Sequence, residues 1–287
     1  MNKNPKKSLE QILRQAAREF REAGGPTPRL DAELLLCHIL NLKRTDLIIR
    51  SNEPMDINVE RHFKSLCERR LAGEPLAYIR GSQEFYGRTF LVNSDTLIPR
   101  PDTELLVEIA KGLGPFDRPA TIIDIGSGSG NLAITLDLEI ANSIVAGWDI
   151  SEGAIAMAER NAKQLNSTAR FFKKDALNSS SWENGDMVDI IVSNPPYIDS
   201  KDPLIQASVR DYEPATALFA GEQGLVFYKT ISKFCRKKLK VGGKLIFEIG
   251  FRQGDAVTQI LRNQGLAAIE VKKDLSGHDR VVIAELI

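Results

Sequence analysis

The chain is predicted to fold as a doubly wound α/β domain preceded by a small helical bundle. From Thr121 onward, short apolar runs of strand length alternate with segments of helical periodicity, which is the pattern of βαβ units and a doubly wound sheet. Before about residue 75, apolar residues recur at helical spacing instead. The 287 residues are enough to bury a core in each of two domains.

The first part of the chain is expected to contain three helices and a short fourth one. Ser8 and Gln11 form a capping-box pattern at the start of the first helix. The apolar face of that helix comprises Leu9, Ile12, Leu13, Ala16, Ala17 and Phe20. Further helices are expected at 31–40 and 58–71, with a short one at 46–49. We assign residues 1–75 to a helical domain.

The second part of the chain should begin with a linker at residues 76–95 that contains a β-hairpin. Aromatic runs on both sides of Gly87, within residues 85–92, predict this hairpin. Two prolines in Ile98–Glu104 require an extended path before a helix at 105–112. Residues 96–287 form the α/β domain. Its strands are expected at 121–125, 143–148, 170–174, 188–193, 244–249, 267–272 and 280–285, and its helices at 131–140, 152–165, 225–239 and 253–264.

Composition excludes several classes of protein. Lys plus Arg equals Asp plus Glu at 38 each, which makes a nucleic-acid partner unlikely, because such proteins gain affinity by neutralising phosphates. Three scattered cysteines and three scattered histidines predict no metal site and a reduced, intracellular protein. No segment has the pattern of a signal peptide or a membrane span. We therefore expect a cytoplasmic protein, and nothing indicates an obligate dimer, so a monomer is expected.

A glycine-rich turn, Gly126-Ser127-Gly128-Ser129-Gly130, follows the first strand of the α/β domain. Glycines allow a tight turn and a close approach to a ligand, although many α/β proteins need glycine there for packing alone. The spacing differs from the Gly-x-Gly-x-x-Gly of dinucleotide-binding proteins. Asp124, two residues before the turn, would repel a pyrophosphate and could face the cationic end of a ligand.

Two acidic residues end the next two strands. Asp149 ends the second strand of the domain, where a carboxylate can accept hydrogen bonds from both ribose hydroxyls, or can cap the following helix. Asp175 ends the third strand and could accept the adenine amino group beside Ala176, or could be an ordinary loop carboxylate. On successive strand ends, the glycine turn and these acids together describe a pocket for an adenosine without phosphates. S-adenosylmethionine fits that description.

The strand at 188–193 runs directly into Asn194-Pro195-Pro196-Tyr197. Asn-Pro is also a common turn dipeptide, so this segment could simply end the strand. Two prolines are stiff and remove two donors, however, which leaves acceptors. The Asn194 side-chain oxygen and the Pro195 carbonyl can each accept one N–H of a planar NH₂ group, and the Tyr197 ring can pack on that group. We assign catalysis to Asn194 and Pro195, and substrate binding to all four residues.

These motifs together resemble class I methyltransferases that modify planar nitrogens. More of the chain is similar to the HemK/PrmC family. The matching stretches are Pro28–Leu36, Gly73–Ile79, Leu97–Glu104, Tyr212-Glu213-Pro214, Gly224-Leu225, Glu248-Ile249-Gly250 and Asp274–Arg280. They extend over nearly the whole chain, including the helical part.

The resemblance implies a Rossmann-like class I methyltransferase domain. It also implies methylation of the glutamine in the Gly-Gly-Gln motif of peptide chain release factors, which act in translation termination. The cofactor would be S-adenosyl-L-methionine and its product S-adenosyl-L-homocysteine. By this resemblance the cofactor is held by Gly126, Ser127, Gly128, Ser129, Gly130, Asp149, Asp175, Ala176 and Asn194. The stretch Ile98–Glu104 borders the active site, with no individual role assigned, and the helical domain at residues 1–75 is expected to recognise the substrate.

Three other interpretations remain open from the sequence. A DNA adenine methyltransferase would need the same catalytic loop but also basic surface for phosphates, and this chain has no net positive charge. A glutamine methyltransferase of a ribosomal protein would share the cofactor and the chemistry. A non-catalytic module that senses the cofactor would not need an intact Asn194–Tyr197 loop.

Overall fold

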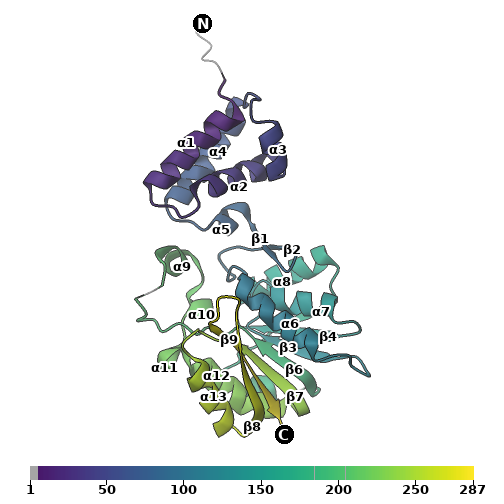
Figure 1. The fold of residues 1–287 in the computed structure, drawn as a ribbon. Coiled ribbons are helices and arrows are strands. Elements are labelled where there is room, and N and C mark those ends of the chain that lie inside the picture. The colour runs from purple at the N-terminus through teal and green to yellow at the C-terminus, as the bar shows by residue number, and fades with distance from the viewer. Residues whose placement is uncertain (1–5, 184, 204) are drawn as a thin grey trace. The chain divides into compact units, whose positions relative to one another are not determined.

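The computed structural model describes residues 6–183, 185–203 and 205–287 (Figure 1). The chain divides into two compact units. The helical unit runs up to Gly81 and includes Ala207–Tyr212, and the α/β unit comprises Ser82–Gln206 and Glu213–Ile287. The division therefore differs from the expected one. Residues 76–81 belong to the helical unit, and the hairpin belongs to the α/β unit instead of forming a separate linker.

The helical unit is built around the amphipathic first helix. Its helices are α1 (Leu9–Glu22), α2 (Pro28–Leu40), α3 (Arg44–Ile49), α4 (Ile57–Leu71), α5 (Leu76–Arg80) and α9 (Ala207–Tyr212). The expected capping box is present, because Ser8 Oγ accepts from the Gln11 N–H at 3.3 Å and Gln11 accepts from the Ser8 N–H at 2.9 Å. All six residues of the expected apolar face are buried, where they pack with residues of α2 and α4.

Helix α5 was not predicted from the sequence, and neither was helix α9. Helix α9 lies far along the chain, after the Asn194–Tyr197 loop, and none of its residues is buried. Tyr212 connects it to the rest of the unit, because its hydroxyl donates to the Ala72 carbonyl at 2.9 Å. A six-residue helix without a buried face leaves no periodicity in the sequence that could have indicated it.

Within the described residues, one seven-stranded sheet forms the centre of the α/β unit, in the order β5-β4-β3-β6-β7-β9-β8. The strands are β3 (Thr121–Ile125), β4 (Ile144–Asp149), β5 (Arg170–Lys173), β6 (Val188–Ser193), β7 (Leu239–Glu248), β8 (Leu266–Lys273) and β9 (Asp279–Leu286). All seven expected strands are present. Strands β3 to β7 are parallel, whereas β9 pairs antiparallel with both β7 and β8.

Two layers of helices cover the sheet. Helices α6 (Glu104–Gly112), α7 (Asn131–Glu139) and α8 (Glu152–Leu165) pack on one face, in a core that includes Ile122. Helices α12 (Val226–Phe234) and α13 (Gly254–Asn263) pack on the other, in a core that includes Ile123. Successive residues of β3 thus face opposite layers, as they must in a strand buried on both sides.

Strand order reverses beside β3. Its two neighbours are β4 and β6, and the connections from β3 to β4 and from β5 to β6 run in opposite directions across the sheet. In open α/β sheets, ligands bind at the carboxyl ends of the strands next to such a switch point. The glycine turn directly follows β3, Asp149 is the last residue of β4, and Asn194 directly follows β6. The fold therefore brings these three parts of the sequence to one edge.

The remaining elements are short. They are β1 (Ser82–Phe85), β2 (Arg88–Leu91), η1 (Pro101–Thr103), η2 (Ser179–Trp182), α10 (Ala215–Leu218), α11 (Gly221–Gly224) and η3 (Cys235–Lys237). The expected hairpin is present and starts a little earlier than predicted, with Tyr86 and Gly87 in the left-handed region as a two-residue turn. The expected extended path before α6 is wrong at its end, because Pro101–Thr103 forms a 3₁₀ turn.

Three expectations from the sequence concerned the cysteines, metal sites and membrane-spanning segments. Cys37, Cys67 and Cys235 are buried free thiols, and burial raises the pKa of Cys67 to about 12. In the parts of the chain that the structure describes, no group of three or more His, Cys, Asp or Glu side chains could hold a metal ion. Over the same residues, no helix combines the length and apolar character needed to cross a membrane.

Asn161 on α8 generates a prediction about stability. Its side chain is fully buried, accepts from the Leu91 N–H at 2.7 Å, and donates to the carbonyls of Leu91 and Ser129 at 2.9 and 2.8 Å. Asn161→Ala would leave these backbone groups unpaired, and should lower the free energy of unfolding by roughly 2–4 kcal/mol. Denaturant unfolding measures this. Exposed Asn263 is the control, and an equal, small effect of Asn263→Ala and Asn161→Ala would contradict the prediction.

Candidate active site

The glycine turn has two different reasons for its glycines. Gly126, Gly128 and Gly130 have φ values of 78°, 54° and 79°, a region that favours glycine. A Cβ on Gly130 would lie 2.9–3.0 Å from side-chain atoms of Ile134, Ala158 and Phe171, so this glycine is required by helix packing. Side chains on Gly126 and Gly128 would meet no such crowding. At these two positions the turn conformation itself requires glycine.

A cavity of about 360 Å³ lies at the carboxyl ends of β3, β4 and β6. Most of the residues predicted from the sequence line it. These are Gly126, Gly128, Asp149, Asp175, Ala176, Asn194, Pro195 and Pro196. Ser127 instead lines a small adjoining cavity, and Ser129, Gly130 and Tyr197 line neither. Of the four proposed substrate residues, the structure therefore brings three to the cavity wall.

The Asp149 carboxylate is held in place by backbone donors. Its Oδ2 accepts from the Gly128 N–H and its Oδ1 from the Ser151 N–H, both at 2.9 Å. The N-cap of α8 is Ser151, whose Oγ accepts from the Ala154 N–H, so Asp149 is not the capping residue. Each carboxylate oxygen has two acceptor sites, so Asp149 can still accept one further hydrogen bond on each oxygen.

The wall beside Asp175 is formed largely by apolar residues, among them Trp148, Ala176 and Leu177. Asp175 Oδ1 accepts from the Leu177 N–H at 2.8 Å, which fixes the turn after β5. The Ala176 carbonyl accepts from the indole N–H of Trp182 at 3.0 Å, and Trp182 packs edge-on against Trp148 with ring centroids 5.2 Å apart. Trp148 and Ala176 both line the cavity. A planar aromatic ligand can be buried against this wall with a carboxylate at its edge.

A second, smaller cavity of about 30 Å³ contains a buried carboxylate. Its lining includes Asp124 and Asn131, residues 126–128 of the glycine turn, and Leu97, Pro99 and Arg100. Asp124 is 1% exposed and its Oδ2 has no hydrogen-bond partner. Burial raises the pKa of Asp124 to about 7. A buried carboxylate oxygen that lacks a partner favours a cationic or hydrogen-bond-donating group beside it.

The Asn194–Tyr197 loop is fixed at both ends by side chains from other elements. Asn194 Nδ2 donates to Thr103 Oγ1 at 3.1 Å. The Tyr197 carbonyl accepts from Gln253 at 3.1 Å, and the Tyr197 hydroxyl donates to Glu248 Oε1 at 3.5 Å. The Tyr197 ring packs against the core between the sheet and α12 and α13, and burial raises its pKa. The structure thus gives Tyr197 a role in holding the loop.

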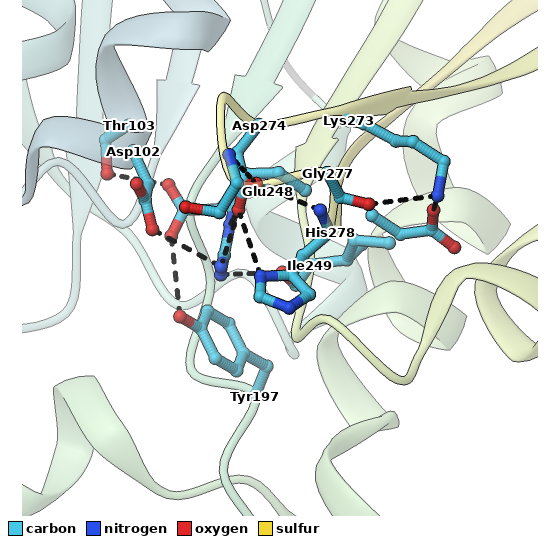
Figure 2. A network of polar contacts seen from close by, with 12 residues as sticks. Asp102, Thr103, Tyr197, Glu248, Ile249, Lys273, Asp274, Gly277 and His278 are labelled. Carbon is cyan, nitrogen blue, oxygen red and sulfur yellow. Dashed lines mark hydrogen bonds and ion pairs between the residues drawn. The ribbon is translucent and has the colours of Figure 1, made fainter.

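Two buried side chains beside this loop, Thr103 and Glu248, were not predicted from the sequence as site residues. Figure 2 shows Thr103 and Tyr197 directed at the carboxyl group of Glu248, the last residue of β7. Glu248 is 2% exposed, and burial raises its pKa to about 7. Both Thr103 and Glu248 lie in stretches that carried the family resemblance without a role of their own.

Arg100 and Glu213 form a further ion pair at this edge. Glu213 is buried, pairs with the Arg100 guanidinium, and accepts from the Ile98 N–H at 3.1 Å. These two contacts of Glu213 hold the stretch from Leu97 to Arg100 in place, and both of these residues line the small cavity. Nothing in the sequence indicated that Glu213 is the partner of Arg100, because the two residues lie far apart along the chain.

Both units match known protein families. A family described as the PrmC N-terminal domain matches residues 11–81, and one described as the methyltransferase small domain matches residues 101–215. Among solved structures, a methyltransferase from Pyrococcus furiosus shares the fold, with a TM-score of 0.52 and 15% identity. The similarity covers 78% of this chain and 97% of that one.

Curated relatives match over most of the chain. Release factor glutamine methyltransferases of Enterococcus faecalis and Koribacter versatilis are 40% and 38% identical, over 84% and 96% of this chain and 87% and 98% of the relatives. A bifunctional methyltransferase of Rickettsia typhi is 39% identical over 96% of this chain, which spans 57% of that longer protein. The chain belongs to the family of release factor glutamine methyltransferases.

Proposed function

We propose that this protein transfers a methyl group from S-adenosylmethionine to the side-chain amide nitrogen of the glutamine in the Gly-Gly-Gln motif of peptide chain release factors. One observation carries the proposal. Asn194 and Pro195, the two candidate acceptors for a planar NH₂ group, line a cavity of nucleoside size at the switch point of the sheet. The family to which the chain belongs supplies the identity of the acceptor protein.

The residues of the two cavities fit the cofactor. Asp149 can accept hydrogen bonds from the two ribose hydroxyls, and Asp175 can accept one from the adenine amino group. Trp148 and Ala176 can cover the adenine ring. Asp124, with an unpartnered oxygen, suits the ammonium group of the methionine part. When bound, S-adenosylmethionine supplies an electrophilic methyl group on its sulfonium, and S-adenosyl-L-homocysteine is the product.

The loop residues have to make a poor nucleophile react. An amide nitrogen is weakly nucleophilic because its lone pair is delocalised. Two acceptors, the Asn194 Oδ1 and the Pro195 carbonyl, can hold the two N–H groups and favour the localised lone pair. Each contributes about 1–3 kcal/mol if its hydrogen bond strengthens in the transition state. Orientation of the nitrogen in line with the methyl group supplies the larger share.

No strong base is needed for this reaction. The proton leaves only after positive charge has developed on the nitrogen, when it is acidic enough to pass to water. The loop therefore serves to bind and orient the amide. Pro195 is buried and Pro196 is half-buried, and these two rings also keep water away from one side of the reacting group. Binding to a release factor, a cytoplasmic location and a monomeric state remain predictions.

The acceptor can be tested directly. The protein is incubated with methyl-labelled S-adenosylmethionine and, in parallel, a release factor, a ribosomal protein fraction or double-stranded DNA. Label should appear in the release factor and disappear when its Gly-Gly-Gln glutamine is replaced by asparagine. Label confined to the ribosomal fraction or to DNA would reject the proposed acceptor while leaving methyl transfer intact.

Asn194→Ala tests the two-acceptor mechanism. The change removes one acceptor and should lower kcat by about 100-fold or more, because both the hydrogen bond and the orientation are lost. The Kd of the cofactor should stay within about threefold of wild type. Steady-state methyl transfer and calorimetric titration measure the two quantities. Equal losses in kcat and in cofactor affinity would indicate that the loop is only structural.

Asp124→Asn tests the cation partner through pH dependence. A carboxyl group whose pKa is raised on folding is destabilising when ionised, so its contribution to stability is lost as pH rises from about 4 through about 7. The neutral variant should therefore be more stable than wild type at pH 8, by roughly 2–4 kcal/mol, and similar to it at pH 4. The pKa of Glu248 is also raised by burial, but Glu248 is present in both proteins and so does not contribute to the difference between them.

The same variant should bind the cofactor at least about tenfold more weakly at pH 8, because an amide cannot pair with an ammonium group as a carboxylate does. Wild-type affinity should rise as pH increases through about 7, and the variant's affinity should not. Denaturant unfolding and calorimetry at pH 5 and 8 measure both effects. Unchanged cofactor affinity in the variant would remove Asp124 from the cofactor site.

A further inference from the structure

A chain of hydrogen bonds joins the catalytic loop to a carboxyl group buried behind it. Asn194 Nδ2 donates to Thr103 Oγ1 at 3.1 Å, and Thr103 Oγ1 donates to Glu248 Oε2 at 2.6 Å. Thr103 is 3% exposed and Glu248 is 2% exposed. Figure 2 shows Thr103 and Tyr197 approaching Glu248 from different segments. The two-acceptor mechanism alone makes no use of this connection.

The direction of these bonds follows from the charge on Glu248. An ionised carboxylate can only accept hydrogen bonds, so the Thr103 hydroxyl has to donate its one proton to it. Thr103 can then only accept from Asn194, and the amide NH₂ is the only donor on that side chain. The oxygen of the amide is thereby turned away from Thr103. An asparagine amide is otherwise nearly symmetric in shape, so sterics alone would not select one orientation.

We propose that Glu248, acting through the Thr103 hydroxyl, is a positioning residue that fixes which end of the Asn194 amide faces the substrate. The inference rests on the proposed function, in which Asn194 Oδ1 accepts an N–H of the target amide. Without this connection, the amide would spend part of its time with its NH₂ group toward the target NH₂, where two donors oppose each other. Glu248 itself does not touch the reacting atoms.

The surroundings of Glu248 make its charge sensitive to pH. Burial raises its pKa to about 7, whereas the Thr103 hydrogen bond and the charge of Arg280 lower it, and Asp102 raises it. Arg280 also pairs with Asp102 at 3.3 Å and Asp274 at 3.1 Å.

Tyrosine hydroxyls complete these surroundings. Tyr197 faces one oxygen of Glu248, and Tyr228 on α12 donates to its backbone carbonyl at 3.0 Å. A protonated Glu248 can donate a hydrogen bond to Thr103 Oγ1. The Thr103 hydroxyl is then free to donate its own hydrogen bond to the Asn194 side-chain oxygen, which would reverse the amide. The orientation of the amide is therefore conditional on an ionised Glu248.

Thr103→Val and Thr103→Ser test the relay. Valine keeps the shape and removes the hydroxyl, and should lower kcat by about 10- to 100-fold, since misorientation of one catalytic group has effects of this size. Serine keeps the hydroxyl and should stay within about threefold of wild type. The cofactor Kd should stay within about twofold in both. A kcat for Thr103→Val within twofold of wild type, or an equal loss of cofactor affinity, would overturn the proposal.

Thr121→Val is the matched control. Thr121 Oγ1 donates to a carboxylate, Asp189, at 2.7 Å, but it begins β3 and so lies at the opposite end of that strand from the site. Its loss should lower stability and leave kcat unchanged. A drop in kcat equal to that of Thr103→Val would mean that removing a hydroxyl–carboxylate bond anywhere in the unit has the same effect, and would reject a specific relay.

The pH profile of kcat gives a readout that a merely structural role would not change. At saturating cofactor, which keeps Asp124 paired, wild-type kcat should fall as pH decreases from 8 to 6, because Glu248 becomes protonated. In Glu248→Gln this dependence should be absent. If that variant does not fold, Thr103→Val supplies the same test, because it has no hydroxyl to reverse. A wild-type pH dependence that persists in these variants would overturn the proposal.

Failure of the proposed function gives a different result. If wild type labels DNA or a ribosomal protein and not the release factor, the acceptor is wrong, and the Thr103 series can be measured with the substrate that is labelled. If Asn194→Ala keeps full turnover, the two-acceptor mechanism fails. If Asn194→Ala loses turnover and Thr103→Val does not, only the positioning role of Glu248 fails.

Discussion

The site depends on the edge at which β3, β4 and β6 end side by side. Parallel strands place their last residues in one row, and the reversal of strand order at β3 leaves room there for a ligand. The glycine turn and Asn194 directly follow β3 and β6, and Asp149 is the last residue of β4. Residues almost seventy positions apart in the sequence thus form one cavity because the sheet pairs their strands.

Most of the sheet could be predicted from the sequence, because buried parallel strands are continuous apolar runs with helices between them. The cavity residues that follow strands were predictable for the same reason. Thr103, Glu248 and Glu213 were not, since a threonine or glutamate in a sequence carries no sign of its distant partner. Helix α9 was missed because it lacks a buried face, and the hydrogen bond between Tyr197 and Glu248 was missed because these two residues lie far apart in the sequence.

Two buried carboxyl groups, Asp124 and Glu248, oppose the stability of the unit in which they lie. Burial raises the pKa of each to about 7, so ionisation near neutral pH is unfavourable in the folded protein. Both stand at the carboxyl end of a sheet strand, where the proposed cofactor and the Asn194 loop lie. Such residues lower the stability of the folded protein near neutral pH, so a search for stabilising substitutions would select against them.

The discontinuity of the helical unit has a consequence for dissecting this protein. Because Ala207–Tyr212 belongs to that unit, no single cut in the chain separates the two units. A fragment that starts at Ser82 would still carry α9 and would leave Tyr212 without the Ala72 carbonyl to which it donates. Loss of activity in such a fragment would not by itself measure substrate recognition. Exchanging the helical unit between relatives would require replacing both segments together.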